Sequence, residues 1–304
     1  MTQSDLLISV VIPAYNYAST LSRAVRSVLP ELTERHELIV IDDGSTDHTP
    51  EVLGQLHQEF PGAFRSLRKA NGGSASARNR GIEEGRGSYL VFLDADDAMA
   101  PGALRALEAH IQQNPQTRMV IGGSCSVWPD GRQREQLPSA LPDSPRARLR
   151  GYLLDKTIGI ANGASAMHRE LFSCGLYPEH FRNAEDIPVF SQALANFPCS
   201  VLMEPLAFIY KHDDSLRHNV KYDREVGVAL VDEVFSPARM PVAFADLRRA
   251  FMAQRCLSLF RGYLQAGDRA SAKEMYCQAL CTDWRAIFRW SYTGKALRLW
   301  LGLK

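Results

Sequence analysis

The feature that constrains the fold most is an alternation of two kinds of segment over the first hundred residues. Apolar, β-branched runs such as LISVVIPAY (7–15) and ELIVIDDGS (37–45) alternate with segments such as TLSRAVRSVLPEL (20–32), whose apolar residues recur at helical spacing. Continuous apolar runs are typical of strands that are buried on both faces. The alternation therefore predicts an α/β fold, in which an open parallel sheet is covered by helices on both faces.

Polar side chains follow three of the four predicted strands, at the point where each strand ends. They are Asn16 after the first strand, Asp42 and Asp43 after the second, and Asp94, Asp96 and Asp97 after the fourth. Ligands of parallel sheets bind outside the carboxyl ends of the strands. We therefore expect these side chains to meet at one site.

The segment LDADD (93–97) suggests a metal site. Asp94 and Asp96 stand two positions apart, so in extended chain both point the same way, about 6.6 Å apart. Two such carboxylates repel unless a cation lies between them and a ligand. Oxygen ligands suit Mg²⁺ or Mn²⁺, which complete their shell with water and substrate phosphates. For this motif alone, a polar turn at a strand end is an equally good interpretation.

Two further segments are compatible with a nucleotide ligand. In VIDDGSTD (40–47), strand alternation lets only one of Asp42 and Asp43 face it. In NGGSASARNRG (71–81), small residues allow close backbone approach, and Arg78 and Arg80 can meet a phosphate or a base. The second segment is neither a P-loop nor GxGxxG, and it follows the third predicted strand, so dinucleotide binding is disfavoured.

Five segments in this order resemble the inverting glycosyltransferases of family 2, which have the GT-A fold. They are VVIPAYN, VIDDGSTD, NGGSASARNRG, FLDADD and AEDIPVF. The resemblance covers about residues 6–217. It implies a nucleotide-sugar donor, with a UDP-sugar as the first choice, a divalent metal (Mg²⁺ or Mn²⁺) and an acceptor hydroxyl. We expect the acceptor to be a glycan or glycolipid of bacterial-type cell-surface polysaccharide or lipopolysaccharide synthesis.

The resemblance also implies roles for individual residues. On the donor side, Pro13, Tyr15 and Asn16 would line the nucleotide site, Asp43 would hydrogen-bond the base, and Arg78 would close the pocket. Asp94 would contact the ribose or sugar, and Asp96 would bind the metal. His212, with Lys211 behind it, would approach the diphosphate. On the acceptor side, Asn162 and Gly163 would line the floor. Asp97 is expected to cap the turn that follows it.

Inverting transfer also needs a general base for the acceptor hydroxyl. The resemblance assigns this role to Asp186 in NAEDIPVF (183–190), with Glu185 orienting the acceptor. The alternative is that both acids simply favour the N-terminus of a helix through its dipole.

The second half of the chain is less regular. RMVIGGSCSVW (118–128) and VLMEPLAFIY (201–210) predict strands, the Pro-rich segment 129–151 predicts a loop, and GIANGASAMHRELF (159–172) predicts a turn and then a helix carrying His168. From about residue 222 the pattern is helical. The predicted division is a GT-A domain over residues 1–218 and a helical extension over 219–304.

Composition excludes several classes. A net charge of +1 does not indicate a nucleic-acid partner. No run of about 18 apolar residues predicts a spanning helix, and the N-terminal segment fits a first strand better than a signal peptide. The six cysteines form no CxxC pair, which favours buried, reduced thiols. We expect a cytoplasmic protein, with the inner face of the cell membrane as a specific alternative.

The C-terminal segment 284–304 has no acidic residue. Basic residues are interleaved there with aromatic residues. The aromatic residues are Trp284, Phe288, Trp290, Tyr292 and Trp300. Such a mixture suits the interface of an anionic bilayer. A helix that packs on the rest of the protein is an equally good interpretation.

Three competing functions were weighed. A haloacid-dehalogenase-type phosphatase places Asp-x-Asp after the first strand, usually with Thr or Val two residues beyond, where this chain has Ala98 after the fourth strand. A sugar nucleotidyltransferase needs a Gly-rich basic loop after the first strand, which PAYNYAST (13–20) lacks. A catalytically degenerate module that binds a sugar nucleotide or a partner is the third. The presence of Asp43, Asp96 and Asp186 argues against it.

Overall fold

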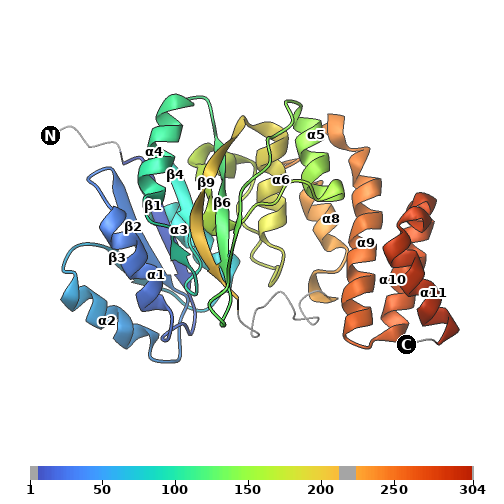
Figure 1. Cartoon of the computed structure of the whole chain (residues 1–304), viewed down its shortest axis with the longest axis horizontal. Helices are drawn as coiled ribbons and strands as arrows, with labels where there is room; N and C mark the ends of the chain where they lie inside the picture. Colours follow the sequence, from blue (N-terminus) through green and yellow to red (C-terminus); the bar gives the residue numbers. More distant parts are fainter. Residues whose placement is uncertain (1–5, 212–223, 303–304) are drawn as a thin grey trace.

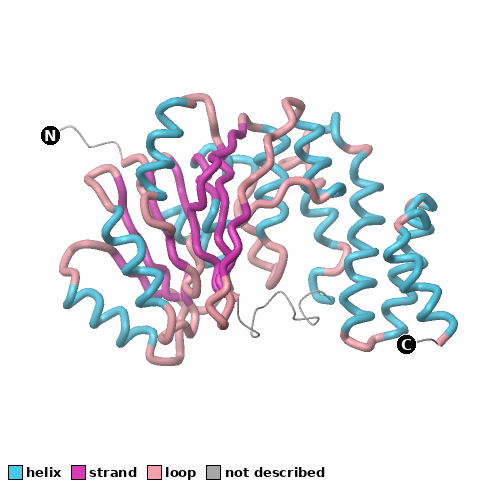
Figure 2. The backbone as a smooth tube through the Cα atoms, viewed as in Figure 1, coloured by secondary structure: helices cyan, strands magenta, loops and turns pink. Residues whose placement is uncertain are grey.

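A computed structural model describes residues 6–211 and 224–302 of the chain. One central sheet lies among helices, and a group of helices extends from one end of it (Figures 1 and 2). The strands are β1 (Ile8–Ala14), β2 (His36–Asp42), β3 (Arg65–Arg68), β4 (Tyr89–Phe92), β5 (Ala98–Met99), β6 (Met119–Val127), β7 (Gln133–Gln136), β8 (Ser165–His168) and β9 (Cys199–Tyr210). The α-helices are α1 (Leu21–Val28), α2 (Thr49–Glu59), α3 (Ser74–Glu84), α4 (Ala103–Gln113), α5 (Pro145–Arg150), α6 (Asp186–Asn196), α8 (Ala229–Val234), α9 (Leu247–Gln265), α10 (Arg269–Thr282) and α11 (Trp290–Leu301).

The sheet has the order β3-β2-β1-β4-β8-β6-β9-β5, and β7 pairs with β6. Strands β3, β2, β1 and β4 are parallel, so their carboxyl ends lie along one edge, with Ala14 beside Asp42. The predicted parallel arrangement therefore holds for the first four strands. The second half is mixed, because β8 is antiparallel to both β4 and β6, while β6 and β9 are parallel.

Helices cover both faces of the sheet, as predicted. Successive residues of β1 point to opposite faces of the sheet. Ile12 belongs to a core with α1, α2 and α4, whereas Val11 packs with α3 and α6. Both side chains are fully buried, which accounts for the continuous apolar run of this strand. The two cores fix the position of the edge where β1, β2 and β4 end.

The predictions for two segments of the second half were wrong. GIANGASAMHRELF forms a 3₁₀ turn, η3 (Asn162–Ala164), and then strand β8, and the helical turns begin only at Arg169, so His168 ends a strand. The Pro-rich segment 129–151 contains strand β7 and helix α5 rather than only a loop. Short strands take their structure from neighbouring strands, which local sequence does not report.

The C-terminal region is helical, as predicted, and α9 and α10 pack together as a helical hairpin. A hydrophobic cluster joins this region to the earlier chain: Leu149, Leu153 and Phe181 pack with Leu230 and Phe251. In Figure 1, α10 and α11 lie at the end of the molecule opposite α2 and β3.

Two further expectations concern the membrane and the cysteines. Within the two described ranges, no helix is long and apolar enough to cross a membrane. All six cysteines are free thiols, but only some are buried, because Cys277 and Cys281 are exposed on α10.

Candidate active site

The predicted site residues of the first half gather where β1, β2 and β4 end. Pro13 is buried within β1, and the first two residues after the strand ends at Ala14, Tyr15 and Asn16, are exposed. Tyr15 is 43% exposed. Asn16 has φ +60°, and its side-chain oxygen accepts hydrogen bonds from the amides of Thr46 (2.8 Å) and Asp47 (3.3 Å). Asn16 thus connects the turn after β1 to the turn after β2.

Asp43 is almost completely buried, and its carboxylate is fully engaged. It accepts hydrogen bonds from the amides of Gly72 (3.0 and 3.1 Å) and Gly73 (2.6 Å) and from Lys69 Nζ (2.7 Å). Gly73 has φ +90°, and a Cβ there would lie 2.2 Å from the Arg182 guanidinium, so the position favours glycine. Asp43 therefore fixes the turn that begins α3.

Arg78 lies on α3, in its second helical turn, and is 5% exposed. Its two terminal nitrogens donate to different acids: one to Glu185 (2.7 Å) and the other to Asp94 (2.9 Å). The guanidinium also lies over the ring of Tyr177, 5.5 Å from its centroid. A buried arginine between two carboxylates holds its charge because each acid raises its pKa against the effect of burial. Arg78 links the end of β4 to the start of α6.

The three acids after β4 lie close enough to affect one another. Burial raises the pKa of Asp97 to about 8, and Asp94 and Asp96 add to the shift. Asp97 Oδ1 accepts a hydrogen bond from the amide of Tyr210 at the end of β9 (2.9 Å). Its side chain therefore holds the end of β9 in place and, contrary to expectation, does not cap the following turn. Burial also raises the pKa of Asp94, even though Arg78 opposes the shift.

The donor set at this place fits a hard cation. Carboxylates that repel one another at the edge of a sheet are relieved when a divalent ion binds, and oxygen-only ligands suit Mg²⁺ or Mn²⁺. Within residues 6–211 and 224–302, no group of three or more His, Cys, Asp or Glu is arranged to hold an ion. An ion held by Asp96 and its neighbours would take its other ligands from water and from phosphates.

Glu185 and Asp186 stand at the start of α6. The preceding residue, Ala184, has φ +60°, a conformation that L side chains adopt at a cost. Burial alone would raise the pKa of Glu185, but the Arg78 guanidinium and a hydrogen bond from Ser74 Oγ (2.6 Å) hold it below its usual value. Burial, followed by the charge of Glu185, raises the pKa of Asp186 to about 6. Two adjacent acids with separated pKa values suit different chemical roles.

Asn162 and Gly163, in η3, are buried beneath this region. Asn162 Oδ1 accepts a hydrogen bond from the hydroxyl of Tyr177 (2.9 Å), whose ring faces Arg78. A Cβ at Gly163 would meet Leu93 and Ala207 at 3.4 Å. Asn162 thus connects to Arg78 through Tyr177, whereas Gly163 packs beside Leu93 and Ala207.

His212 lies outside the described residues, as do all of residues 212–223.

Sequence reasoning missed Tyr17, whose hydroxyl pKa is raised by burial and by Asp96, Asp94 and Asp97. A neutral hydroxyl beside those acids can donate a hydrogen bond. Its position two residues after Tyr15 was the one signal for it. Arg23, which contacts the carbonyl of Asp96 and lies 3.7 Å from the ring centroid of Tyr210, carried no such signal.

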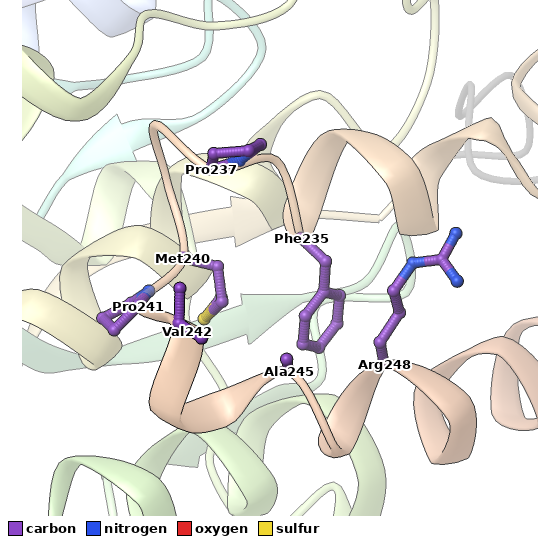
Figure 3. A pocket seen from close by; sticks show the side chains of 7 residues that line it. All are labelled: Phe235, Pro237, Met240, Pro241, Val242, Ala245 and Arg248. Carbon is purple, nitrogen blue, oxygen red and sulfur yellow. The ribbon is translucent and has the colours of Figure 1, made fainter.

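Two hollows lie apart from the acid cluster. One, of about 280 Å³, is lined by Pro50, Leu53, His57 and Leu67 between α2 and β3. The other, of about 130 Å³, is lined mainly by apolar side chains of residues 235–248, and Phe235 and Met240 face each other across it (Figure 3). The first hollow is also lined by Asp42 and Arg68, which form an ion pair (3.6 Å), and the second has Arg248 as its one charged lining residue. The edge of the sheet, where several acids gather, remains the candidate site.

A family model describing Glycosyl transferase family 2 matches residues 9–176, which is more than half of the chain. The chain belongs to glycosyltransferase family 2. The matched range contains the ends of β1, β2 and β4, together with Arg78 and Asn162. It stops before Glu185 and Asp186.

Curated relatives match over shorter parts of their own length. An uncharacterized glycosyltransferase of Bacillus subtilis, EpsJ, is 32% identical over 225 residues, which are 71% of this chain and 64% of that protein. Chondroitin synthase of Pasteurella multocida is 36% identical over 125 residues, 41% of this chain and 13% of that protein. The matches to these two and to the other relatives considered span less than two thirds of the relatives' lengths.

Solved structures share the fold over nearly the whole chain. TarS of S. aureus (residues 1–349), in complex with UDP-GlcNAc, aligns over 92% of this chain and 81% of that one, with a TM-score of 0.65 and 17% identity. The mannosyltransferase PcManGT from Pyrobaculum calidifontis, in complex with GDP-Man and Mn²⁺, aligns over 96% and 80%, with a TM-score of 0.56 and 17% identity. These likenesses confirm the predicted GT-A fold of this family 2 enzyme.

Proposed function

We propose that this family 2 enzyme transfers a sugar, with inversion, from a nucleoside-diphosphate donor to a hydroxyl of a glycan or glycolipid acceptor. The proposed donor is a UDP-sugar, and the proposed setting is bacterial-type cell-surface polysaccharide, lipopolysaccharide or glycolipid synthesis. Two relatives support the setting, since one is named a chondroitin synthase and another a hyaluronan synthase. The UDP-GlcNAc complex of TarS and the GDP-Man complex of PcManGT support a nucleotide-sugar donor.

The observation that carries the proposal is the pair at the start of α6. Asp186, with a pKa of about 6, is ionised at neutral pH yet basic enough to accept a proton. In the proposed reaction its carboxylate takes the proton of the acceptor hydroxyl while that oxygen attacks the anomeric carbon, and the bond to the diphosphate oxygen breaks. Glu185, ionised and fixed by Arg78 and Ser74, would orient the acceptor.

The donor would lie over the ends of β1, β2 and β4. Pro13, Tyr15 and Asn16 would flank the nucleoside, and Asp94 would meet the ribose or the sugar. Asp43 has its oxygens engaged by Lys69, Gly72 and Gly73. For Asp43 to accept a hydrogen bond from the base, Lys69, the one side-chain donor of the three, would therefore have to move aside.

Asp96 would hold the metal, with Asp94 beside it. A divalent cation there would neutralise the charge that develops on the leaving diphosphate. Mn²⁺ in the PcManGT complex supports an ion of this class. We assign Asn162 to the acceptor side through its contact with Tyr177, which faces Arg78. Gly163 is assigned to the acceptor side, and His212 to the diphosphate, from the resemblance alone.

The test uses the full chain and a panel of UDP-, GDP-, CMP- and dTDP-sugars with Mn²⁺. A ligand that binds only the folded state raises the melting temperature, so a selective rise with UDP-sugars identifies the donor class. Products formed on a panel of glycan and glycolipid acceptors are then analysed by NMR. Opposite anomeric configurations in donor and product support the proposal, whereas retention contradicts it. Binding of a donor with neither transfer nor hydrolysis would favour the catalytically degenerate module.

A further inference from the structure

Among the described residues, helix α11 packs against the rest of the protein through one of its faces. Thr293, Ala296 and Leu299 are buried against α10 and α9. The hydroxyl of Tyr276 donates to Thr293 Oγ1 (2.9 Å), and Arg269 donates to the carbonyl of Leu299 (2.9 Å). These contacts fix the orientation of the helix and therefore determine which side chains face outward.

The outward side of α11 carries a second apolar stripe. Trp290, Leu297 and Leu301 are 75%, 59% and 70% exposed. They are separated by seven and four positions, which places them on one face of an α-helix. A helix that is apolar on two faces but packed on only one leaves the other without a partner among residues 6–211 and 224–302.

The 3₁₀ helix η7 (Trp284–Phe288) continues this surface. Trp284, Ile287 and Phe288 are 61%, 44% and 57% exposed, and the rings of Trp284 and Phe288 contact each other. Among the described residues, seven of the twelve exposed large hydrophobic side chains lie between positions 284 and 301. We call these seven the C-terminal patch: Trp284, Ile287, Phe288, Trp290, Leu297, Trp300 and Leu301. An apolar concentration of this kind marks an interaction surface.

Within residues 284–302, every charged side chain is basic. Arg285, Arg289, Lys295 and Arg298 are exposed among the apolar side chains, and no acidic residue follows Asp283 in the sequence. In a two-fold contact between copies, equivalent surfaces meet, so these cations would be brought together. Tryptophans and cations on a segment that has no acid of its own instead match an apolar boundary covered by negative charge.

We propose that the C-terminal patch docks on the surface of an anionic lipid bilayer. The twelve residues of α11 extend about 18 Å, too short to cross a hydrocarbon core of about 30 Å. The helix would therefore lie along the interface, with its tryptophans at headgroup depth and its cations among the lipid phosphates. Docking in this way requires no particular acceptor, so it stands apart from the sugar-transfer proposal.

Vesicle flotation with the full-length protein tests the proposal. Vesicles of phosphatidylcholine alone are compared with vesicles that contain about one third phosphatidylglycerol. The protein should float with the anionic vesicles, and added salt should weaken the binding, because lipid charge attracts cations within a Debye length. Three of the four tryptophans belong to the patch. Their emission should therefore shift to shorter wavelength on binding, measured in a Trp128→Phe background.

Two double variants separate the apolar and charged contributions. Trp290→Ala/Leu297→Ala and Arg289→Gln/Arg298→Gln should each weaken partitioning at least about tenfold. The matched control is Val242→Ala/Met203→Ala, which removes exposed apolar side chains outside the patch and should leave partitioning unchanged. Melting temperatures of all variants should equal that of the wild type, since every replaced side chain is exposed.

Three outcomes would overturn the proposal. One is wild-type protein that remains with neither kind of vesicle. Another is flotation that the two patch variants leave unchanged. The third is self-association in sedimentation that the patch variants abolish while vesicle binding is absent, which would assign the patch to a second copy of the chain.

Discussion

Glu185 and Asp186 are neighbours in the chain, yet their surroundings move their pKa values in opposite directions. Glu185 is held below its usual pKa by Arg78 and Ser74, whereas burial and the charge of Glu185 raise the pKa of Asp186 to about 6. Such a separation assigns a fixed negative charge to one acid and an exchangeable proton to the other.

The raised pKa of Asp186 predicts a pH dependence of activity. Below pH about 6 the carboxylate is protonated in the folded protein and cannot accept the acceptor proton. We expect kcat/KM to fall about tenfold per pH unit below that point. The measurement is a pH profile of nucleoside-diphosphate release. An activity that is unchanged between pH 7 and pH 5 would contradict the assignment.

The same shift predicts a pH dependence of stability. An acid whose pKa is higher in the folded state costs free energy once it is ionised, so the cost is present above pH about 6 and disappears as the pH falls toward about 4. Asp186→Asn should therefore be more stable than the wild type at pH 7.5, by up to about 3 kcal/mol. The difference should close by pH 4. Urea unfolding at both pH values measures it, and a constant difference would contradict the prediction.

Arg78 offers a second test at a single position. Replacing it by Met leaves Glu185 and Asp94 without their shared cation, which typically costs about 3–5 kcal/mol. Arg80, on the same helix, pairs with Glu83 and Glu84 at the exposed surface, and Arg80→Met should cost less than about 1 kcal/mol. Chemical denaturation of both variants checks this. Equal losses would show that Arg78 is not a buried link.

The sequence identified the chemically important residue types but not their partners. Asp43, Arg78, Asp94 and Asp186 stood out because acids and an arginine at strand and helix ends have no packing purpose. The pairing of Arg78 with Glu185, 107 positions away, depends on how α3 and α6 pack on the same face of the sheet. Local patterns do not contain that information.

Helix α3 positions Arg78 because it lies very close to β1. A Cβ at Gly81 would come within 2.3 Å of Val11 Cγ1, whereas a Cβ at Gly54 of α2 would meet nothing within 4 Å. Gly81→Ala should therefore destabilise the protein and lower activity by moving α3. Gly54→Ala should stabilise it by about 0.5–1 kcal/mol, through helix propensity. Thermal unfolding of the two variants gives the comparison, and a stabilising Gly81→Ala would contradict it.

Predictions at the scale of elements succeeded where periodicity was long. Strands β1, β2 and β6 and helices α9 and α10 have enough residues to show their period. Strands β7 and β8 have four residues each, and they exist because β6 lies beside them. The prediction of a helix after Asn162 was wrong because the sheet overrode a weak helical pattern.

For the whole molecule, the division into residues 1–218 and 219–304 stays a prediction. The cluster that joins Leu149 and Leu153 to Leu230 and Phe251 leads us to propose that both parts unfold together. A chain ending at residue 218 should lose cooperative unfolding and expose apolar surface to a dye such as ANS. Calorimetry of the full chain should show one transition. Two separate transitions would support independent domains instead.

The central claim is that Asp186 acts as the base of a glycosyltransferase site. The most direct measurement compares wild type and Asp186→Asn for donor binding and for release of the nucleoside diphosphate, with the donor found in the panel. Donor binding, followed by thermal shift, should be retained, while release should fall about 10²- to 10⁴-fold. Release at the wild-type rate by Asp186→Asn would contradict the account.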